Sequence, residues 1–364
     1  MQNELGPFFG IFLHAVGGLA AASFYIPYTK VQRWAWEVFW IVGGFFSWIV
    51  APWAFALVTV PSTVAILQET PPEALFYTFL FGVLWGIGGL TFGMTMRYLG
   101  IALGYSLVLG LTAVIGTLGP PIVAGQFGAI ICSLSCQVLL VGVSVCLIGV
   151  ALNGRAGFRK ESELPAGIQD TSTGTFSVRK GIVIALFCGI MSSAMAAAFV
   201  AGKPIAEVAI AYGVPTYWQN APVLIVVLLG GFATNVVWCT GLMIKNRSWA
   251  DVLGKVTPNG ESQPDSSTRR QIINVLFCSL AGLLWYLQMF LYGIGTTFMG
   301  AYEFSSWSLH MASIIIFSTL WGIALKEWTG VSRKTITMVA AGLFALVLSI
   351  TLIGWGNALS VGSS

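Results

Sequence analysis

The chain contains two histidines, His14 and His310, and both lie inside long apolar stretches. Because histidine changes its charge near pH 6.5, such a residue could take up a proton on one side of a membrane and release it on the other. A neutral histidine that only hydrogen-bonds a polar ligand or a neighbouring side chain is an open alternative. We predict that both histidines contact the substrate and are candidates for proton coupling.

Three further side chains share one face of a predicted helix, at the spacing of Trp285, Gln288 and Tyr292. The amide of Gln288 offers two donors and an acceptor, which suit vicinal hydroxyl groups, although it could instead bond a neighbouring helix. Gln288 and the two histidines lie at a similar predicted depth, roughly 9 Å from one membrane surface. These side chains are predicted to form one polar, substrate-binding layer.

Trp285 belongs to an internal repeat. The run LFGVLW at 80–85 returns as LAGLLW at 280–285, and Gly93 and Gly100 match Gly293 and Gly300. Duplicated membrane segments are typical of secondary transporters. The symmetry of the repeat leads us to predict that Trp85 and Trp285 form opposite walls of one central cavity, where flat indoles would offer apolar surface to a substrate. Packing of helix against helix is the alternative for both rings.

Other polar residues near the ends of apolar stretches are weaker candidates. Glu37 and Arg97 are predicted near the same membrane surface, where they could form an ion pair or a gate, and Glu37 is also a candidate for proton coupling. Glu303 precedes His310 by two turns and is either the point where protons arrive or a solvated helix cap. Asn235 is a further candidate for sugar contact.

Composition indicates a membrane protein: 57% of residues are hydrophobic, 8% are charged and the mean hydropathy is +0.85, whereas soluble domains carry about 25% charged residues. A bilayer core about 30 Å thick requires roughly 20 apolar residues per helix. The predicted fold class is an all-α membrane protein with ten transmembrane helices. They are predicted at Phe8–Tyr28, Ala35–Leu57, Leu75–Met96, Ile101–Val123, Ser135–Leu152, Gly181–Val200, Ala221–Met243, Ile272–Ile294, Phe304–Leu325 and Thr335–Gly356.

The distribution of basic residues predicts the orientation. Every Lys and Arg except Lys203 falls in predicted loops on one side, and the positive-inside rule places that side in the cytoplasm and both termini outside. The domains are predicted as a first five-helix repeat at 1–152, a cytoplasmic linker at 153–180 and a second five-helix repeat at 181–364. Five is odd, so the second repeat is inverted relative to the first.

Several classes of function are disfavoured. The six cysteines have no zinc-type spacing, and the dispersed titratable groups do not form the cluster that an intramembrane enzyme requires. The basic residues are scattered through loops and leave no nucleic-acid footprint. We predict no enzyme activity, no metal and no cofactor, with the proton as coupling ion, membrane lipid as the surroundings and no nucleic acid as partner.

Several strings resemble the L-rhamnose–proton symporter family. They include YIPYTKV at 25–31, GMTMRYLG at 93–100, LWYLQ at 284–288 and SWSLHM at 306–311, and the resemblance spans nearly the whole chain. It implies the drug/metabolite transporter fold and sugar uptake driven by protons. By this resemblance Tyr25 joins the substrate-binding residues and Lys30 the gate. Gly89 stands where the family pattern has an Asn, which leaves the exact sugar open.

We therefore predict a proton-coupled importer of L-rhamnose or a closely related 6-deoxy or hexose sugar in the bacterial cytoplasmic (inner) membrane, with alternating access around a midplane site. The alternative is an exporter of a small metabolite or drug with the same fold. A cation exporter would require a deep carboxylate, and none is evident at mid-depth. A purely structural membrane protein would not explain polar residues gathered at one depth.

Overall fold

The computed structural model describes residues 6–99, 101–123, 125, 128, 133–163, 178–249 and 267–361. Within these residues all regular elements are helices and there is no strand. The first part of the chain forms α1 (Gly6–Ser23), α2 (Tyr25–Tyr28), α3 (Trp36–Phe45), the π-helical turn η1 (Phe46–Val50), α4 (Ala51–Thr59), α5 (Thr63–Glu69), α6 (Pro72–Leu99), α7 (Ile101–Val123) and α9 (Leu134–Glu163).

The second part forms α10 (Val178–Ala201), α11 (Lys203–Ala211), the 3₁₀ turn η2 (Thr216–Trp218), α12 (Ala221–Asn246), α14 (Ser267–Thr296), the 3₁₀ turn η3 (Gly300–Ser305), α15 (Ser306–Ala324) and α16 (Arg333–Val361). Across the described residues, nine helical segments are long and apolar enough to cross a membrane. The fourth predicted stretch coincides with α7, whose apolar part, Leu107–Val123, is shorter than these nine.

Prolines explain two departures from continuous helices. In a regular α-helix the ring of Pro52 would clash with the carbonyl of Trp48, and Pro52 has no N–H to donate to that carbonyl. The second predicted stretch accordingly contains η1 between α3 and α4, where we had expected one regular helix. Pro27 acts in the same way on the carbonyl of Ser23, where α1 ends. The short helices α5 and α11 were not predicted either.

Several helices extend beyond their predicted ends. α9 continues to Glu163, so the first part of the predicted linker 153–180 is helical, and α10 begins at Val178. α14 begins at Ser267 and not near 272. Polar helix ends of this kind have no apolar signal, so hydropathy alone cuts them short.

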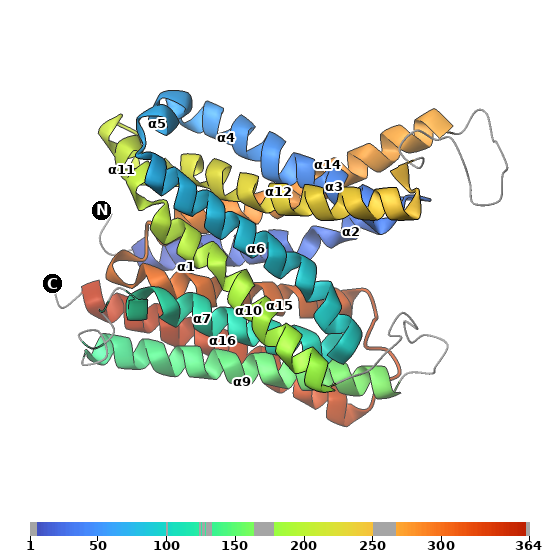
Figure 1. Ribbon diagram of the computed structural model, residues 1–364. Coiled ribbons are helices and arrows are strands. Elements are labelled where there is room, and N and C mark those ends of the chain that lie inside the picture. Colours follow the sequence, from blue (N-terminus) through green and yellow to red (C-terminus); the bar gives the residue numbers. More distant parts are fainter. Residues whose placement is uncertain are drawn as a thin grey trace.

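Figure 1 shows the helices running between two ends of an elongated bundle. One end, here called the terminal end, carries the start of α1, the end of α16 and the short helices α5 and α11. The other, called the basic end, carries the last turns of α9 and α12 and the first turns of α10 and α14. α1 and α10 run in opposite directions between these ends.

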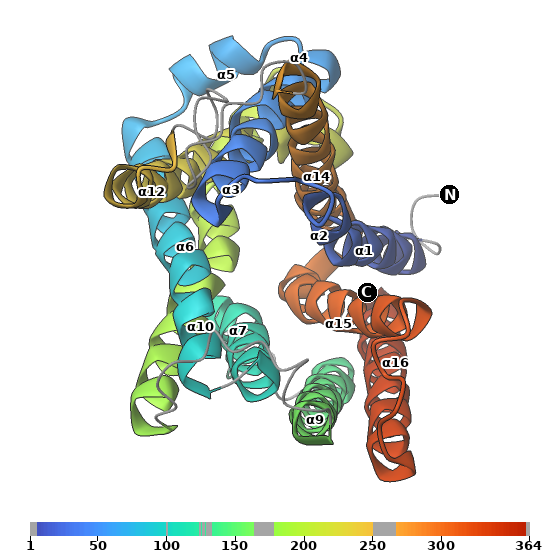
Figure 2. The ribbon, with the colours of Figure 1, turned by 90° about the vertical axis from the view of Figure 1, so that its right-hand side faces the viewer.

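The two halves of the chain are interleaved. α1 packs against α14 and α15 of the second half, and α10 packs against α6 and α7 of the first half. α9 lies along α16. Figure 2, viewed from the basic end, shows α6 and α10 on one side of the bundle and α1 and α15 on the opposite side.

Repeat-related glycines allow the closest helix contacts. A Cβ on Gly82 of α6 would overlap the carbonyl oxygen of Val227 in α12, and a Cβ on Gly282 of α14 would overlap the carbonyl oxygen of Gly43 in α3. Small residues at membrane helix interfaces let backbones approach in this way. The LFGVLW repeat therefore supplies the same contact twice.

We predict that Gly82→Ala lowers thermal stability in detergent, because the new methyl group must push the backbone of α12 away. Overpacking of this kind costs about 1–3 kcal/mol. Gly241→Ala is the matched control, since no atom lies within 4 Å of a Cβ built there. Equal melting temperatures for the two variants would contradict this account of the contact.

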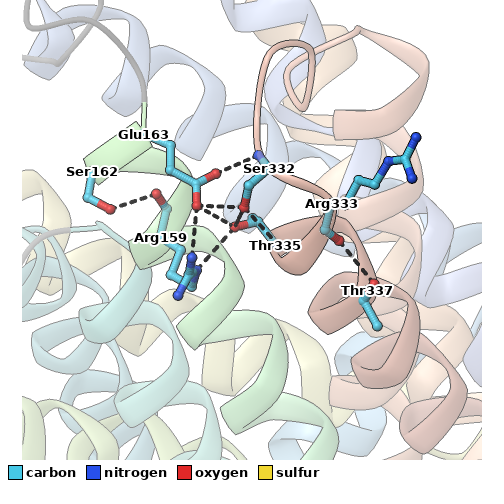
Figure 3. Close-up of polar contacts among 7 residues, drawn as sticks. All are labelled: Arg159, Ser162, Glu163, Ser332, Arg333, Thr335 and Thr337. Carbon is cyan, nitrogen blue, oxygen red and sulfur yellow. Dashed lines mark hydrogen bonds and ion pairs between the residues drawn. The ribbon is translucent and has the colours of Figure 1, made fainter.

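A carboxylate joins α9 to the start of α16 (Figure 3). Glu163 accepts hydrogen bonds from the Ser332 backbone N–H at 2.7 Å, the Ser332 hydroxyl at 2.8 Å and the Thr335 hydroxyl at 2.9 Å. Arg159 lies 3.1 Å away. These donors, led by the backbone N–H of Ser332, hold the pKa of Glu163 at about 2, below its usual value of 4.5.

A depressed pKa makes the stabilisation by Glu163 complete above pH 4.5 and removes it as the pH falls toward 2. We therefore expect Glu163→Gln to melt below the unaltered chain at pH 7, with the difference shrinking between pH 4.5 and 2. Melting temperatures across this range provide the measurement. In a Ser332→Ala background the same substitution should matter less; an undiminished effect there would disprove the role of Ser332.

Candidate functional site

Four polar side chains from three helices meet inside the bundle, and we call them the histidine layer: His14 of α1, Gln288 and Tyr292 of α14, and His310 of α15. All four are buried. His310 Nε2 lies 3.3 Å from Gln288 Oε1, so the tautomer with a proton on Nε2 donates this hydrogen bond. The Tyr292 ring lies 5.4 Å from each histidine ring, and the two histidine rings are 6.3 Å apart.

Glycines allow α1 to carry His14 into this layer. A Cβ on Gly17 would come 3.2 Å from the backbone oxygen of Gln288, and a Cβ on Gly295 would come 2.8 Å from the ring of His14. The histidine therefore occupies space that a side chain at 295 would fill. The convergence of His14, Gln288 and His310, predicted from their common depth, is present in the structure.

The ring of His14 is unusual among the described residues, because neither of its nitrogens has a hydrogen-bond partner. Buried polar groups are usually paired, and leaving one unpaired costs about 1–3 kcal/mol. Titratable groups inside a membrane-spanning bundle are costly and commonly functional. The histidine layer therefore offers buried, unpaired hydrogen-bonding groups to a polar ligand.

A tryptophan cluster lies near this layer along α14. The rings of Trp85 and Trp285 are 5.4 Å apart, and the ring of Trp48 from η1 meets both edge-on at 6.0 and 5.7 Å. In this conformation the two repeat-related rings contact each other directly, where we had expected walls separated by a cavity. Sequence reasoning missed Trp48, which lies outside the repeated LFGVLW run and reaches the cluster only through the tertiary fold.

Two other candidates for sugar contact, Asn235 and Tyr25, and the gate candidate Lys30 have different surroundings. Asn235 is buried and its amide is engaged, because Oδ1 accepts from Trp40 Nε1 at 3.0 Å and Nδ2 donates to the Gly231 carbonyl at 2.8 Å. Tyr25 is 48% exposed and Lys30 is exposed near the end of α2. The structure therefore does not bring these three into the histidine layer.

Glu37 fastens two helices at the basic end. It is buried at the start of α3, and its Oε1 accepts hydrogen bonds from Asn246 Nδ2 at 3.0 Å and Ser248 Oγ at 2.6 Å, near the end of α12. The side chain of Arg97, its predicted partner, lies outside the described residues.

A second link at the basic end joins the segment after α2 to α14. The Gln32 backbone N–H donates to Asn274 Oδ1 at 3.0 Å, and Asn274 Nδ2 donates to the Gln32 carbonyl at 2.9 Å. Trp34 Nε1 donates to Gln271 Oε1 at 2.8 Å. Together with Glu37, these bonds hold helices of both halves together at this end.

Glu303 stands at the opposite end. We had expected it to open the ninth helix, but it lies in η3, and α15 begins only at Ser306. A 3₁₀ turn tightens the helix entrance, which periodicity cannot detect. Glu303 Oε1 forms an ion pair with Lys203 Nζ of α11 at 2.5 Å. Sequence reasoning did not predict this pair. The available signal was that Lys203 is the single Lys or Arg predicted on the same side as Glu303.

A cavity of about 240 Å³ lies beside this ion pair. Its lining includes Lys203 and Glu303 together with Tyr292, so the cavity begins at the exposed ion pair and reaches the buried ring of the histidine layer. The lining comes from α7, α10, α11, α14 and η3, with Gln219 and Asn220 from the segment before α12 and Thr297 just after α14. No group of three His, Cys, Asp or Glu side chains that could hold a metal occurs in the part of the chain that the structure describes.

Comparisons with known proteins agree along the whole length of the chain. Residues 1–359 match the sequence model of the L-rhamnose-proton symport protein (RhaT) family. A protein of Shigella dysenteriae serotype 1 named L-rhamnose-proton symporter is 37% identical over 352 residues, covering 96% of this chain and 98% of its own. Proteins of the same name from Escherichia coli strains ATCC 8739 and O157:H7 are 36% identical with the same coverage. The chain therefore belongs to the L-rhamnose–proton symport protein family, a family of transporters and not of enzymes.

Proposed function

We propose that this protein imports L-rhamnose, or a closely related 6-deoxy or hexose sugar, together with protons. Relatives that share more than a third of its residues over nearly the full length carry the name of that activity. The observation in the structure that supports it most is the histidine layer, where an amide suited to hydroxyl groups hydrogen-bonds a histidine able to carry a proton.

The fold proposed for this activity has ten transmembrane helices in two inverted five-helix repeats, as in the drug/metabolite transporter superfamily. The exchanged packing of α1 and α10 supports it, since each first helix contacts the third and fourth spans of the other half. The paired contacts of Gly82 and Gly282 follow the same symmetry. Residues 1–152 and 181–364 would then be the two repeats.

We place the protein in the bacterial inner membrane with both termini outside. The basic residues gathered at one end favour that end as cytoplasmic. The cavity then opens to the outside, while the hydrogen bonds of Glu37 and Asn274 close the cytoplasmic end. This arrangement corresponds to the outward-facing state of an alternating-access cycle.

In this cycle sugar and proton bind together at the histidine layer. Gln288 and His310 hold the sugar hydroxyl groups, His14 or His310 carries the proton, and Tyr292 with the tryptophan cluster provides apolar surface for the sugar ring and its methyl group. Release follows when the bonds at the basic end break. A membrane potential of 100 mV adds about 2.3 kcal/mol per proton, which corresponds to a sugar gradient of roughly 50-fold.

The direct test is uptake of radiolabelled sugars into proteoliposomes with an imposed proton gradient, acidic outside. L-Rhamnose should accumulate, and a protonophore should abolish accumulation. Uptake of L-mannose, L-lyxose and L-fucose is compared with that of L-rhamnose to identify the transported sugar. Uptake that ignores the proton gradient, or movement of none of these sugars, would overturn the proposal, and accumulation driven in the outward direction would favour export.

Two variants separate sugar binding from proton coupling. Gln288→Ala removes a buried hydrogen-bonding group, so we expect the KM for L-rhamnose to rise about tenfold. His310→Gln keeps a neutral hydrogen-bonding group but cannot be protonated, so it should exchange sugar without a gradient and fail to accumulate it. Gln68→Ala, exposed on α5, is the matched control. Normal proton-driven accumulation by His310→Gln would exclude His310 as the proton carrier and leave His14, Glu303 and Glu37.

A further inference from the structure

The ring of Tyr292 separates the cavity at the terminal end from the other three side chains of the histidine layer, His14, Gln288 and His310. Tyr292 is 4% exposed and lines the cavity. Its ring contacts the rings of His14 and His310 at 5.4 Å, Trp307 at 5.5 Å and Phe199 at 5.2 Å. Held by four rings, Tyr292 forms a floor. A molecule in the cavity therefore does not reach Gln288 in this conformation.

The size of the cavity fits a small ligand. Its volume of about 240 Å³ is slightly below the range of roughly 300 to 1,000 Å³ that is common for ligand sites. Drug-sized ligands need the larger values, so a ligand of monosaccharide size is the better match. At the mouth, the side chains of Lys203 and Glu303 are 56% and 46% exposed. Exposed ion pairs are weak, so this one can separate when a ligand passes.

The lining favours a neutral molecule that carries many hydroxyl groups. Gln219 contributes an amide next to the aromatic ring of Phe199. Asn220, Thr296 and Thr297 contribute oxygens that can accept hydrogen bonds, since their donors already bond the carbonyls of Gly293 and Ile294. Amides and hydroxyls both donate and accept hydrogen bonds, and an aromatic ring suits the apolar face of a sugar.

The charges in the lining disfavour an anion. The positive charge of Lys203 is neutralised by Glu303, and Glu207 adds a second carboxylate. An anionic ligand would meet more negative than positive charge here. Among the small molecules that fit the volume, a neutral sugar is therefore the class that the walls match best.

We propose that this cavity is a second, outer binding site for the transported sugar, occupied before Tyr292 moves and admits the sugar to the histidine layer. The identity of the sugar rests on the proposed function. The existence of two sites that are occupied one after the other does not follow from that function. A transporter with a single midplane site would need no outer site.

The test is protection of a cysteine placed in the cavity. Two variants, Thr297→Cys and Gln219→Cys, place a cysteine in the lining from two different segments. Thr216→Cys, at an exposed position of η2 outside the lining, is the matched control. A membrane-impermeant cationic methanethiosulfonate reagent is added outside, and the labelling rate is measured with and without L-rhamnose. The unaltered chain, whose five described cysteines are buried, gives the background rate.

With L-rhamnose at about ten times its dissociation constant, we expect labelling of both cavity cysteines to slow about tenfold by occupancy. Labelling of Thr216→Cys should not change. The same protection should persist when Gln288→Ala is added, because the outer site does not use that amide.

Two results would overturn the proposal. One is a variant that transports L-rhamnose while neither cavity cysteine is protected. The other is protection that disappears with Gln288→Ala, which would mean that a single inner site closes the cavity when it is filled. A failure of the proposed function itself is distinguishable, since the unaltered chain would then neither take up nor bind L-rhamnose.

Discussion

The structure depends on the requirement that a polypeptide in a bilayer satisfy its own backbone hydrogen bonds, since hydrocarbon offers none. Every described regular element is accordingly helical. Lipid gives helices little reason to associate, so contact depends on close backbone approach at small residues. Gly82 and Gly282 provide that approach at related positions, and Gly17 and Gly295 provide it where α1 crosses the second half.

Close packing also decides where polarity can lie. His14 and His310 are fully buried, and Gly295 leaves room for the ring of His14, since a Cβ there would come 2.8 Å from it. The two ends of the bundle also differ in their polar contacts. At the basic end, amides and a carboxylate join the two halves, whereas the described cavity lies at the terminal end beside an exposed ion pair. The two ends of the bundle therefore differ.

Much of the helical plan could be predicted from the sequence, because the apolar stretches are long and a bilayer fixes the length they need. Helix ends were less predictable. α9 and α14 continue into polar residues that hydropathy does not mark, and the π-helical turn η1 depends on how the helix accommodates Pro52. Glu303 was predicted at the start of the ninth helix, whereas α15 begins three residues later, after a 3₁₀ turn.

The sequence by itself determined the class of protein, the internal repeat and the common depth of His14, Gln288 and His310, because each follows from local composition or from spacing along a helix. Only the tertiary structure decided that His310 bonds Gln288, that Trp48 joins Trp85 and Trp285, and that Lys203 pairs with Glu303. These partners lie on different helices, and the rotation of one helix against another is set by packing at glycines across the whole bundle. No pattern within a single segment records it.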